Sequence, residues 1–432
     1  MKKLLVLAGA GPHSKVVESA KKMGIYTIVT DYLENSPAKL VADESLMNSI
    51  TDVEELVQYC KENSVDGVLG FCIDPTQKPA QEIAQRCGLP TFGTKEQVFS
   101  LTNKKAFKTL CVQTGVDIIP EYQEADINTN KIVYPVLVKP VDSRGSRGCE
   151  VCNTVDALIA AIPSAKKESS DGNVIIERYM EKNQDLTITY VVKNGEPTLV
   201  SLGDRYPGRK EDNLNRQLSC TIQPSRYTKM YMENVDARVK SMIKHLGIQN
   251  GPVFMQGFVD GDTVRMYDPG IRFPGNEYER IVEKATGIDL MKAIISYVVG
   301  GEIDDHNGRI VGSYDLEGQC AIQYIINVSE GEIAKFDGLD EIAKHPKVID
   351  VQQRHFIGTK IAQTGDIRHR AGEVSILVER DMDKMIEMIN FVQSKLKIED
   401  VDGNNMIISP INSEMIRKIY TQADYQLQES EK

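Results

Sequence analysis

The chain has 432 residues, too many for one hydrophobic core, and fits roughly two to four compact domains. Its 41 % hydrophobic and 26 % charged residues are typical of soluble globular domains and exclude a fibrous or disordered class. The net charge of −11 argues against nucleic acid as a partner, and no apolar run reaches the roughly 18 residues of a membrane helix. Eight scattered cysteines favour reduced thiols, so we expect a cytoplasmic protein that binds no membrane.

Apolar runs alternate with amphipathic segments over residues 1–95. The runs predict strands at Lys3–Leu7, Tyr26–Thr30 and Gly67–Cys72, and the amphipathic segments predict helices at Ser14–Met23, Val53–Lys61 and Pro79–Cys87. Such alternation indicates a parallel sheet covered by helices on both faces. We therefore predict a Rossmann-like domain over residues 1–95.

The first turn of that domain, Gly9 to Ser14, half-matches a dinucleotide-binding fingerprint. Asp31 follows at a suitable spacing, but Ser14 stands where the third glycine belongs. Because such turns also occur where no dinucleotide binds, a nicotinamide-dependent dehydrogenase remains a distant alternative.

The pattern changes after residue 95. A lysine-rich helix is expected at Asn103–Val112, strands at Tyr134–Pro140, Asn173–Glu177, Val253–Val259 and Thr263–Tyr267, and a helix at Gly287–Val298. Further along, a hairpin at Ser329–Glu332 and a helix at Asp381–Lys397 indicate a smaller α+β unit. The predicted domains are residues 1–95, residues 96–305 with a lid subdomain at about 112–190, and residues 306–432.

A lysine and a flexible loop suggest a site for nucleotide phosphates. No Gly-Lys dipeptide occurs in the chain, so a Walker A loop is excluded. Lys139 instead ends an apolar strand, and a loop rich in Gly, Ser and Arg follows at Ser143–Gly148. Backbone N–H groups and positive charge are what phosphate oxygens require.

The order of these features resembles that of the ATP-grasp superfamily. That family has a lysine opening a helix, as in Asn103-Lys104-Lys105-Ala106-Phe107-Lys108, a lysine in a PVxVKP strand, as at residues 135–140, and a phosphate flap. The resemblance implies phosphate contacts from Lys104, Lys139, Ser143, Gly145, Ser146 and Gly148. It also implies a multi-domain α/β and α+β architecture with an amino-terminal Rossmann-like domain and a small carboxy-terminal α+β domain.

The same resemblance assigns an adenosine site. The apolar segment Val174–Met180 looks like the family's adenine-binding segment, which implies contacts from Glu177, Arg178 and Met180. Asp185, eight residues after Glu177, matches the acidic position that binds the ribose hydroxyls. A carboxylate can accept hydrogen bonds from both hydroxyls.

The metal site departs from the family pattern. The family places a carboxylate on one strand and an ExNxR sequence on the next, where Gln256 and Asp268 stand here as the implied Mg²⁺ ligands, with Mn²⁺ as a substitute. Gly270 replaces the asparagine, and Arg272 is retained as the residue expected to stabilise charge on the transferring phosphoryl group. A single anionic ligand thus remains.

Two further arginines are weaker candidates for binding the substrate carboxylate. Arg205 and Arg209 lie in an Arg-bearing segment, and arginine can bind carboxylate through two parallel hydrogen bonds. The tail containing Asp366–Glu373 resembles the carboxy-terminal domain of L-amino acid ligases, which closes one side of the substrate pocket.

The resemblance implies an ATP-dependent carboxylate–amine ligase that forms an acyl phosphate and releases ADP and phosphate. The expected partners are a small carboxylate, such as an amino acid, and an amine; a homodimer is plausible. One alternative is a purine-biosynthesis-type ligase or carboxylase, which would need a phosphate site at the turn from Gly9 to Ser14. Another is a nucleotide-binding protein with weak or no catalysis, suggested by Gln256 and Gly270.

Overall fold

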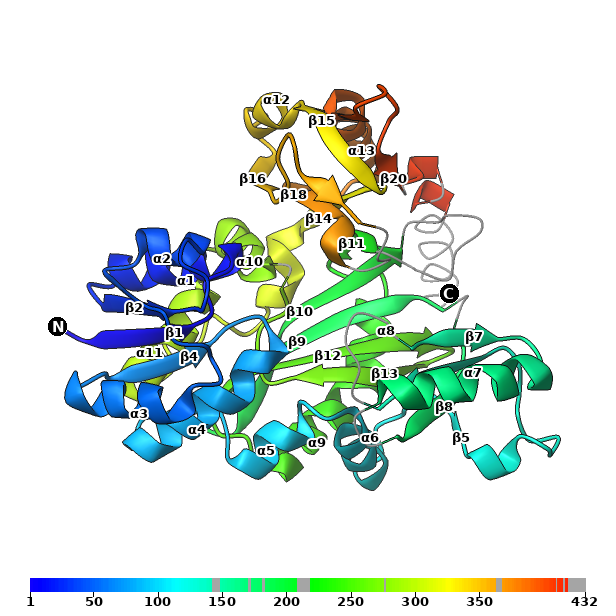
Figure 1. Ribbon diagram of the computed structural model, residues 1–432, viewed down its shortest axis with the longest axis horizontal. Coiled ribbons are helices and arrows are strands. Elements are labelled where there is room, and N and C mark those ends of the chain that lie inside the picture. Colours follow the sequence, from blue (N-terminus) through cyan, green and yellow to red (C-terminus); the bar gives the residue numbers. More distant parts are fainter. Residues whose placement is uncertain are drawn as a thin grey trace.

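The computed structural model describes residues 1–141, 148–169, 172–180, 183–207, 218–275, 277–362, 367–408, 410–414 and 416–418. Figure 1 shows three lobes around a central sheet: an amino-terminal lobe on the left, a lid sheet on the right and a carboxy-terminal lobe above. None of the helices in these ranges is long and apolar enough to cross a membrane. The multi-domain mixture of parallel and antiparallel sheets confirms the predicted fold class.

The amino-terminal lobe is built on a parallel sheet in the order β3-β2-β1-β4. Its strands are β1 (Lys3–Leu7), β2 (Tyr26–Thr30), β3 (Glu44–Leu46) and β4 (Gly67–Gly70), and its helices are α1 (Gly11–Lys22), α2 (Pro37–Val41), α3 (Val53–Glu62) and α4 (Gln77–Cys87). Because side chains alternate along a strand, Leu5 and Leu7 face α3 and α4, while Leu4 and Val6 face α1. The parallel sheet predicted from the alternating pattern is confirmed.

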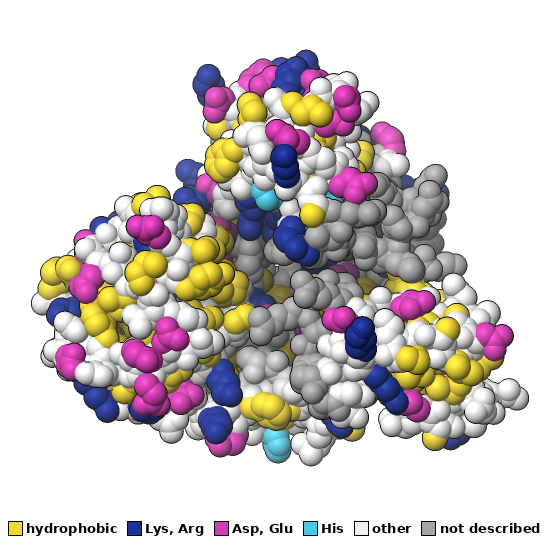
Figure 2. All heavy atoms as spheres, in the orientation of Figure 1, with side chains coloured by type: hydrophobic (Ala, Val, Ile, Leu, Met, Phe, Trp, Pro, Cys, Tyr) yellow, Lys and Arg dark blue, Asp and Glu magenta, His cyan; other side chains and the backbone are white. Residues whose placement is uncertain are grey.

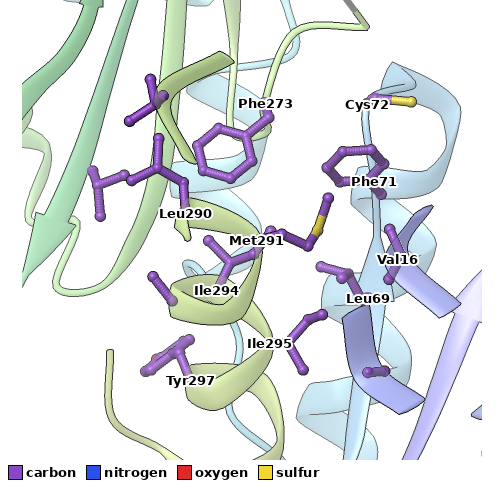
Figure 3. Close-up of a cluster of buried hydrophobic side chains, with 14 of the residues drawn as sticks. Val16, Leu69, Phe71, Cys72, Phe273, Leu290, Met291, Ile294, Ile295 and Tyr297 are labelled. Carbon is purple, nitrogen blue, oxygen red and sulfur yellow. The ribbon is translucent and has the colours of Figure 1, made fainter. Parts of the chain in front are cut away.

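A helix from far along the chain completes this lobe. Helix α11 (Leu290–Gly300) packs against α1 and β4, although about 200 residues separate it from β4 in the sequence. Figure 3 shows Met291 and Ile295 of α11 facing Leu69 and Phe71, all in one dry cluster. This shared core fixes the end of β4, and with it Asp74 shortly after the strand, relative to the central sheet.

The central sheet is antiparallel and runs β13-β12-β9-β10-β11-β14-β18-β16 through the described residues. Its first five members are β13 (Thr263–Gly270), β12 (Gly251–Asp260), β9 (Asp185–Lys193), β10 (Glu196–Pro207) and β11 (Leu218–Gln223). The helices associated with this part are α5 (Lys95–Ser100), α6 (Lys104–Gln113), α8 (Thr228–Asn234), α9 (Asp236–Leu246) and α10 (Tyr278–Thr286). Residues of α6 and α9 share one core with β9, β12 and β13.

The lid is a separate antiparallel sheet in the order β5-β8-β6-β7. It contains β5 (Glu121–Tyr122), β6 (Val136–Pro140), β7 (Glu150–Cys152) and β8 (Val174–Arg178), covered by α7 (Val155–Glu168). Its apolar residues form a cluster of their own, distinct from the core under α6. The lid sheet and α6 therefore meet mainly through polar side chains.

The carboxy-terminal lobe extends the central sheet. Strands β14 (Gln319–Val328), β18 (Arg370–Glu379), β16 (Val348–Gln353) and β20 (Ile407–Ile408) belong to that sheet, and β15 (Gly331–Asp337), β17 (Lys360–Ile361) and β19 (Lys397–Asp400) form another beside α12 (Leu339–Ala343) and α13 (Met382–Lys395). The predicted hairpin at Ser329–Glu332 is wrong, because β15 pairs with β17 and β19 and not with β14. The short turn between an apolar and a more polar strand locally predicts a hairpin. In the structure β14 pairs with β18, and β15 pairs with β17 and β19.

Candidate functional site

Two lysines of α6 contact different neighbours, one on the central sheet and one on the lid. The Asn103 side chain caps the helix by accepting a hydrogen bond from the Ala106 N–H at 3.0 Å. Lys104 and Lys108 are four residues apart and therefore lie on one face. The Lys104 Nζ lies 3.5 Å from the Asp268 Oδ1, whereas Lys108 turns toward the lid.

A buried row of charges joins α6 to the lid sheet. The Glu177 carboxylate accepts one hydrogen bond from the Lys108 Nζ at 2.6 Å and another from the Lys139 Nζ. Lys108 also pairs with Glu121 on β5. Glu177 and Lys139 come together because β6 and β8 are neighbours in register, with Lys139 opposite Ile175. Lys108 is absent from the residues singled out by the sequence, although its spacing from Lys104 was visible.

Burial makes this row electrostatically strong. Lys108, Lys139 and Glu177 are only 3 %, 7 % and 2 % exposed. Burial acts to raise the pKa of the Glu177 carboxyl, but the two lysines outweigh it and hold that pKa below its ordinary value. Burial lowers the pKa of Lys139, with Lys108 and Lys104 acting in the same direction against Glu177. A cation held at this position is well placed to meet an anionic ligand.

The segment predicted to meet adenine follows directly after Glu177. The backbone N–H groups of Arg178 and Tyr179 already donate to the carbonyls of Pro120 and Pro135, at 2.9 and 3.0 Å. The Arg178 guanidinium pairs with Asp260 at 2.9 Å, while the Met180 side chain is buried. Met180 therefore offers an apolar surface, and the first two N–H groups of the segment are engaged within the protein.

Asp185, the predicted ribose ligand, lies in a polar cluster with Arg205. Its carboxylate accepts hydrogen bonds from the Arg205 Nη1 at 2.8 Å and from the Tyr267 hydroxyl at 3.0 Å. The Arg205–Asp185 contact follows from the register of β9 and β10. Although burial acts to lower it, Asp185, Tyr267 and Asp268 raise the pKa of Arg205, which stays charged. Arg205 thus lies beside Asp185, the predicted ribose ligand.

The two candidate metal ligands stand opposite each other on neighbouring strands. Gln256 on β12 pairs in register with Asp268 on β13, so their side chains share one face of the sheet. No group of three or more His, Cys, Asp or Glu side chains that could hold a metal occurs among the described residues. One carboxylate, one amide oxygen and phosphate oxygens of a bound nucleotide nevertheless suit Mg²⁺, which usually keeps several waters. The donor set fits the ion.

Arg272 is held rigidly by an acidic residue of the amino-terminal lobe. Its Nε donates to the Asp74 Oδ1 at 2.5 Å, its Nη2 to the Asp74 Oδ2 at 3.1 Å, and its Nη1 to the Phe273 carbonyl at 3.1 Å. The guanidinium carbon lies 5.1 Å from the centre of the Phe254 ring. A Cβ at Gly270 would come within 3.2 Å of both the Arg272 Cγ and Phe254, so glycine leaves room for this placement.

The carboxy-terminal lobe brings two further arginines close to Arg205. Arg354 on the segment after β16 and Arg370 on β18 both pair with Glu373, Arg370 at 3.3 Å. Burial lowers the pKa of Arg370, and the neighbouring charges of Arg354 and Arg205 lower it further against Glu373. Figure 2 shows Lys and Arg side chains along the hollow between the amino-terminal and carboxy-terminal lobes. An anion is the ligand that this charge distribution favours.

Several predicted residues lie outside the described part of the chain. Ser143, Gly145, Ser146 and Arg209 are among them. Gly148, at the end of the predicted flap, has a positive φ of 67°, and a Cβ there would come within 2.9 Å of Pro140, so glycine is required beside the strand that carries Lys139.

The fold combines a parallel amino-terminal sheet, a central antiparallel sheet and a separate lid sheet. Residues 97–306 match the family model described as "Carbamoyl-phosphate synthase L chain, ATP binding domain", and residues 5–84 match "PylC-like, N-terminal domain". Residues 97–306 thus form an ATP-grasp domain, and the resemblance of the chain to the ATP-grasp superfamily of ADP-forming ligases is confirmed. At the level of the family, ATP and Mg²⁺ as cofactors are confirmed too.

Known relatives cover several reactions. A formate-dependent phosphoribosylglycinamide formyltransferase from Wolinella succinogenes is 28 % identical over 211 residues, 44 % of this chain and 51 % of the relative. The chain thus spans about half the length of that relative. The solved L-amino acid ligase from Bacillus licheniformis has a TM-score of 0.75 at 19 % identity, covering 93 % of this chain and 99 % of that one. Phosphoribosylglycinamide synthetase from Anaerococcus prevotii has a TM-score of 0.73 at 18 % identity, covering 92 % and 99 %. Identities this low show the fold alone.

Proposed function

We propose that the chain is an ATP-dependent ligase that joins a small carboxylate, such as an amino acid, to an amine. The observation that carries the proposal is a chain of neighbouring charges: Lys104, which helps to lower the pKa of Lys139, lies 3.5 Å from Asp268, and Asp268 helps to raise the pKa of Arg272. Bound MgATP would supply the phosphoryl group that converts the carboxylate into an acyl phosphate, which an amine then attacks with release of phosphate. Activation is needed because a carboxylate is a poor electrophile.

In this proposal the side chains bind the charged parts of MgATP: its phosphates, its metal ion and the phosphoryl group that is transferred. Lys104 and Lys139 contact the nucleotide phosphates together with the flap residues Ser143, Gly145, Ser146 and Gly148. Gln256 and Asp268 supply oxygen ligands for the metal, and Lys104, now 3.5 Å from Asp268, moves toward phosphate oxygens. Because Arg272 is fixed before any ligand arrives, its free N–H groups can stabilise the transferring phosphoryl group without reorganisation.

The adenosine site in this proposal uses the hinge after β8. Met180 and the apolar strand provide a dry surface for the base, and Glu177 and the backbone from Arg178 onward lie at its edge. Asp185 binds the ribose hydroxyls with spare lone pairs while keeping Arg205 in place. The carboxylate substrate lies among Arg205, Arg370 and Arg354, whose charges are close enough for Arg354 and Arg205 to lower the pKa of Arg370, with Arg209 as a further candidate.

A second candidate, favoured by the similarity to formyltransferases of purine synthesis, is a ligase acting on a ribosyl-phosphate amine. It needs a phosphate site at the turn before α1. There the Gly9 N–H donates to the Asp31 carboxylate at 2.7 Å, and burial lowers the pKa of His13 to about 4, so the ring is neutral. These features place a negative charge and no histidine cation at the turn. They favour the first proposal.

The test is ADP and phosphate release from MgATP with pools of amino acids, other small carboxylates and formate plus a ribosyl-phosphate amine. Wild type is compared with Lys139→Ala and Asp268→Asn, with Lys105→Ala on the exposed face of α6 as control. Release that depends on an amino acid and is lost in both variants supports the proposal. Release only from the pool that contains formate and the ribosyl-phosphate amine selects the second candidate. ATP binding without release from any pool would support a nucleotide-binding protein with little catalysis, as Gln256 and Gly270 suggest.

A further inference from the structure

The buried row Lys108–Glu177–Lys139 contains more charge than phosphate binding by Lys139 requires. Both oxygens of Glu177 are engaged, one by each lysine, and Lys108 alone comes from the body of the molecule rather than from the lid. A buried carboxylate with a single lysine partner would hold that lysine strongly, because charge–charge attraction is large where water is excluded. The question is why Glu177 has two lysines.

We propose that Lys108 is a positioning residue that retains the Glu177 carboxylate when Lys139 leaves it to bind nucleotide phosphate. This inference rests on the proposed binding of ATP between α6 and the lid. As long as Lys108 is present, the departure of Lys139 leaves no unpaired carboxylate, since the Lys108 Nζ stays 2.6 Å from the Glu177 Oε2. Without Lys108, the movement of Lys139 would leave the buried Glu177 carboxylate without a cationic partner, which is strongly unfavourable.

The surroundings of Lys108 fit this role. Its Cα is held by a helix whose apolar face, including Phe107 and Leu110, packs in the core under β9, β12 and β13. Its ammonium group also pairs with Glu121 on β5, so it contacts two lid strands at once. Glu121 is 31 % exposed at its side chain and balances the second positive charge of the row. Lys108 is therefore anchored on the body and bonded to the lid, independently of Lys139.

The role makes a prediction about phosphate that a purely structural lysine does not make. Lys108→Met should weaken the binding of MgATP by at least about tenfold, because Lys139 becomes the sole partner of Glu177. Binding of adenosine, which has no phosphate, should change much less. Lys108→Arg keeps the charge and should bind MgATP nearly as wild type does. Lys105→Met, on the exposed side of the same helix, is the matched control.

A double variant tests the mechanism directly. In Lys108→Met combined with Glu177→Gln, Lys139 has no carboxylate to leave, so MgATP should bind more tightly than it binds to Lys108→Met alone. We would measure all affinities by titration calorimetry on full-length protein whose fold is checked by circular dichroism. The double variant loses both buried charges together and so also serves if Lys108→Met does not fold.

The outcomes separate the two proposals. If wild type binds no MgATP, the proposed function fails before Lys108 is considered. If wild type binds it and Lys108→Met binds it equally well, or loses adenosine affinity to the same extent, the role of Lys108 is wrong while the proposed function stands. A double variant that binds more weakly than Lys108→Met would also contradict the inference.

Discussion

Two buried acidic regions of this molecule are treated in opposite ways. In the lid, Glu177 is 2 % exposed and each of its oxygens accepts a hydrogen bond from a lysine. Where α10 contacts α11 and strand β18, Glu279 on α10 is also 2 % exposed, yet neither oxygen has a hydrogen-bond partner in the described chain. Burial alone therefore does not decide whether a carboxylate is ionised; the neighbouring cations do.

The two buried carboxyl groups differ in the charges around them. Lys139 and Lys108 hold the pKa of the Glu177 carboxyl below its ordinary value, although burial acts to raise it. Burial raises the pKa of Glu279 well above its ordinary value, and the neighbouring Glu277 raises it further. The two buried acids thus differ in their neighbours: Glu177 lies between two lysines, whereas Glu279 lies near another glutamate.

The largest effect should come from Glu177→Leu. It leaves Lys139 buried beside Lys108 without its carboxylate partner, while Lys108 keeps only Glu121, and this should lower the free energy of unfolding by about 3–5 kcal/mol. Urea unfolding followed by circular dichroism measures this. Glu54→Gln, which removes the exposed partner of Arg86, should leave the urea midpoint unchanged. Equal effects of the two substitutions would erase the contrast between buried and exposed pairs.

Glu279→Gln should act in the opposite direction and depend on pH. The pKa of Glu279 in the folded protein lies above the ordinary 4.5. The stability that the protein gains from protonating Glu279 is therefore complete below pH 4.5 and is lost as the pH rises through the folded-state pKa. Glutamine cannot ionise, and we expect it to stabilise the protein by about 1–3 kcal/mol at pH 8 and hardly at pH 4. Urea midpoints at the two pH values provide the measurement. A variant destabilised at pH 8 would show that the ionised form has a partner.

Asp74→Asn should affect turnover more than binding. Arg272 loses a charged, two-point contact and samples other positions, so we expect kcat to fall about tenfold with little change in ATP affinity. Steady-state kinetics with the substrate identified by the release assay separates kcat from KM. Glu82→Gln on the exposed part of α4 is the control. A change confined to ATP affinity would contradict the positioning of Arg272 by Asp74.

The smallest effect is expected for Gly270→Ala. Its Cβ would lie 3.2 Å from the Arg272 Cγ and from Phe254, so the arginine must move by a few tenths of an ångström. We expect kcat to fall about threefold. Gly300→Ala is the control, because a Cβ there meets nothing within 4 Å. An unchanged kcat would show that the position of Arg272 tolerates such a shift.

Local patterns were sufficient for most elements. Strands Lys3–Leu7 and Tyr26–Thr30 are where the apolar runs predict them, and the late helix Met382–Lys395 lies within its predicted range. The apolar strand before Pro140 predicted the setting of Lys139 equally well. These features depend on residues close together in the sequence, whose periodicity is directly visible.

The sequence by itself determined the resemblance to the family and, in the amino-terminal lobe, strands β1, β2 and β4 with helices α1, α3 and α4, whereas the short α2 and β3 were not predicted. Only the tertiary structure decided which charges meet: Lys108 with Glu177, 69 residues apart, and Arg272 with Asp74, 198 residues apart. It also decided that α11 completes the amino-terminal core. The physical reason is that strand and helix periodicities are local, whereas ion pairs and core contacts between distant segments exist only once the sheets have packed.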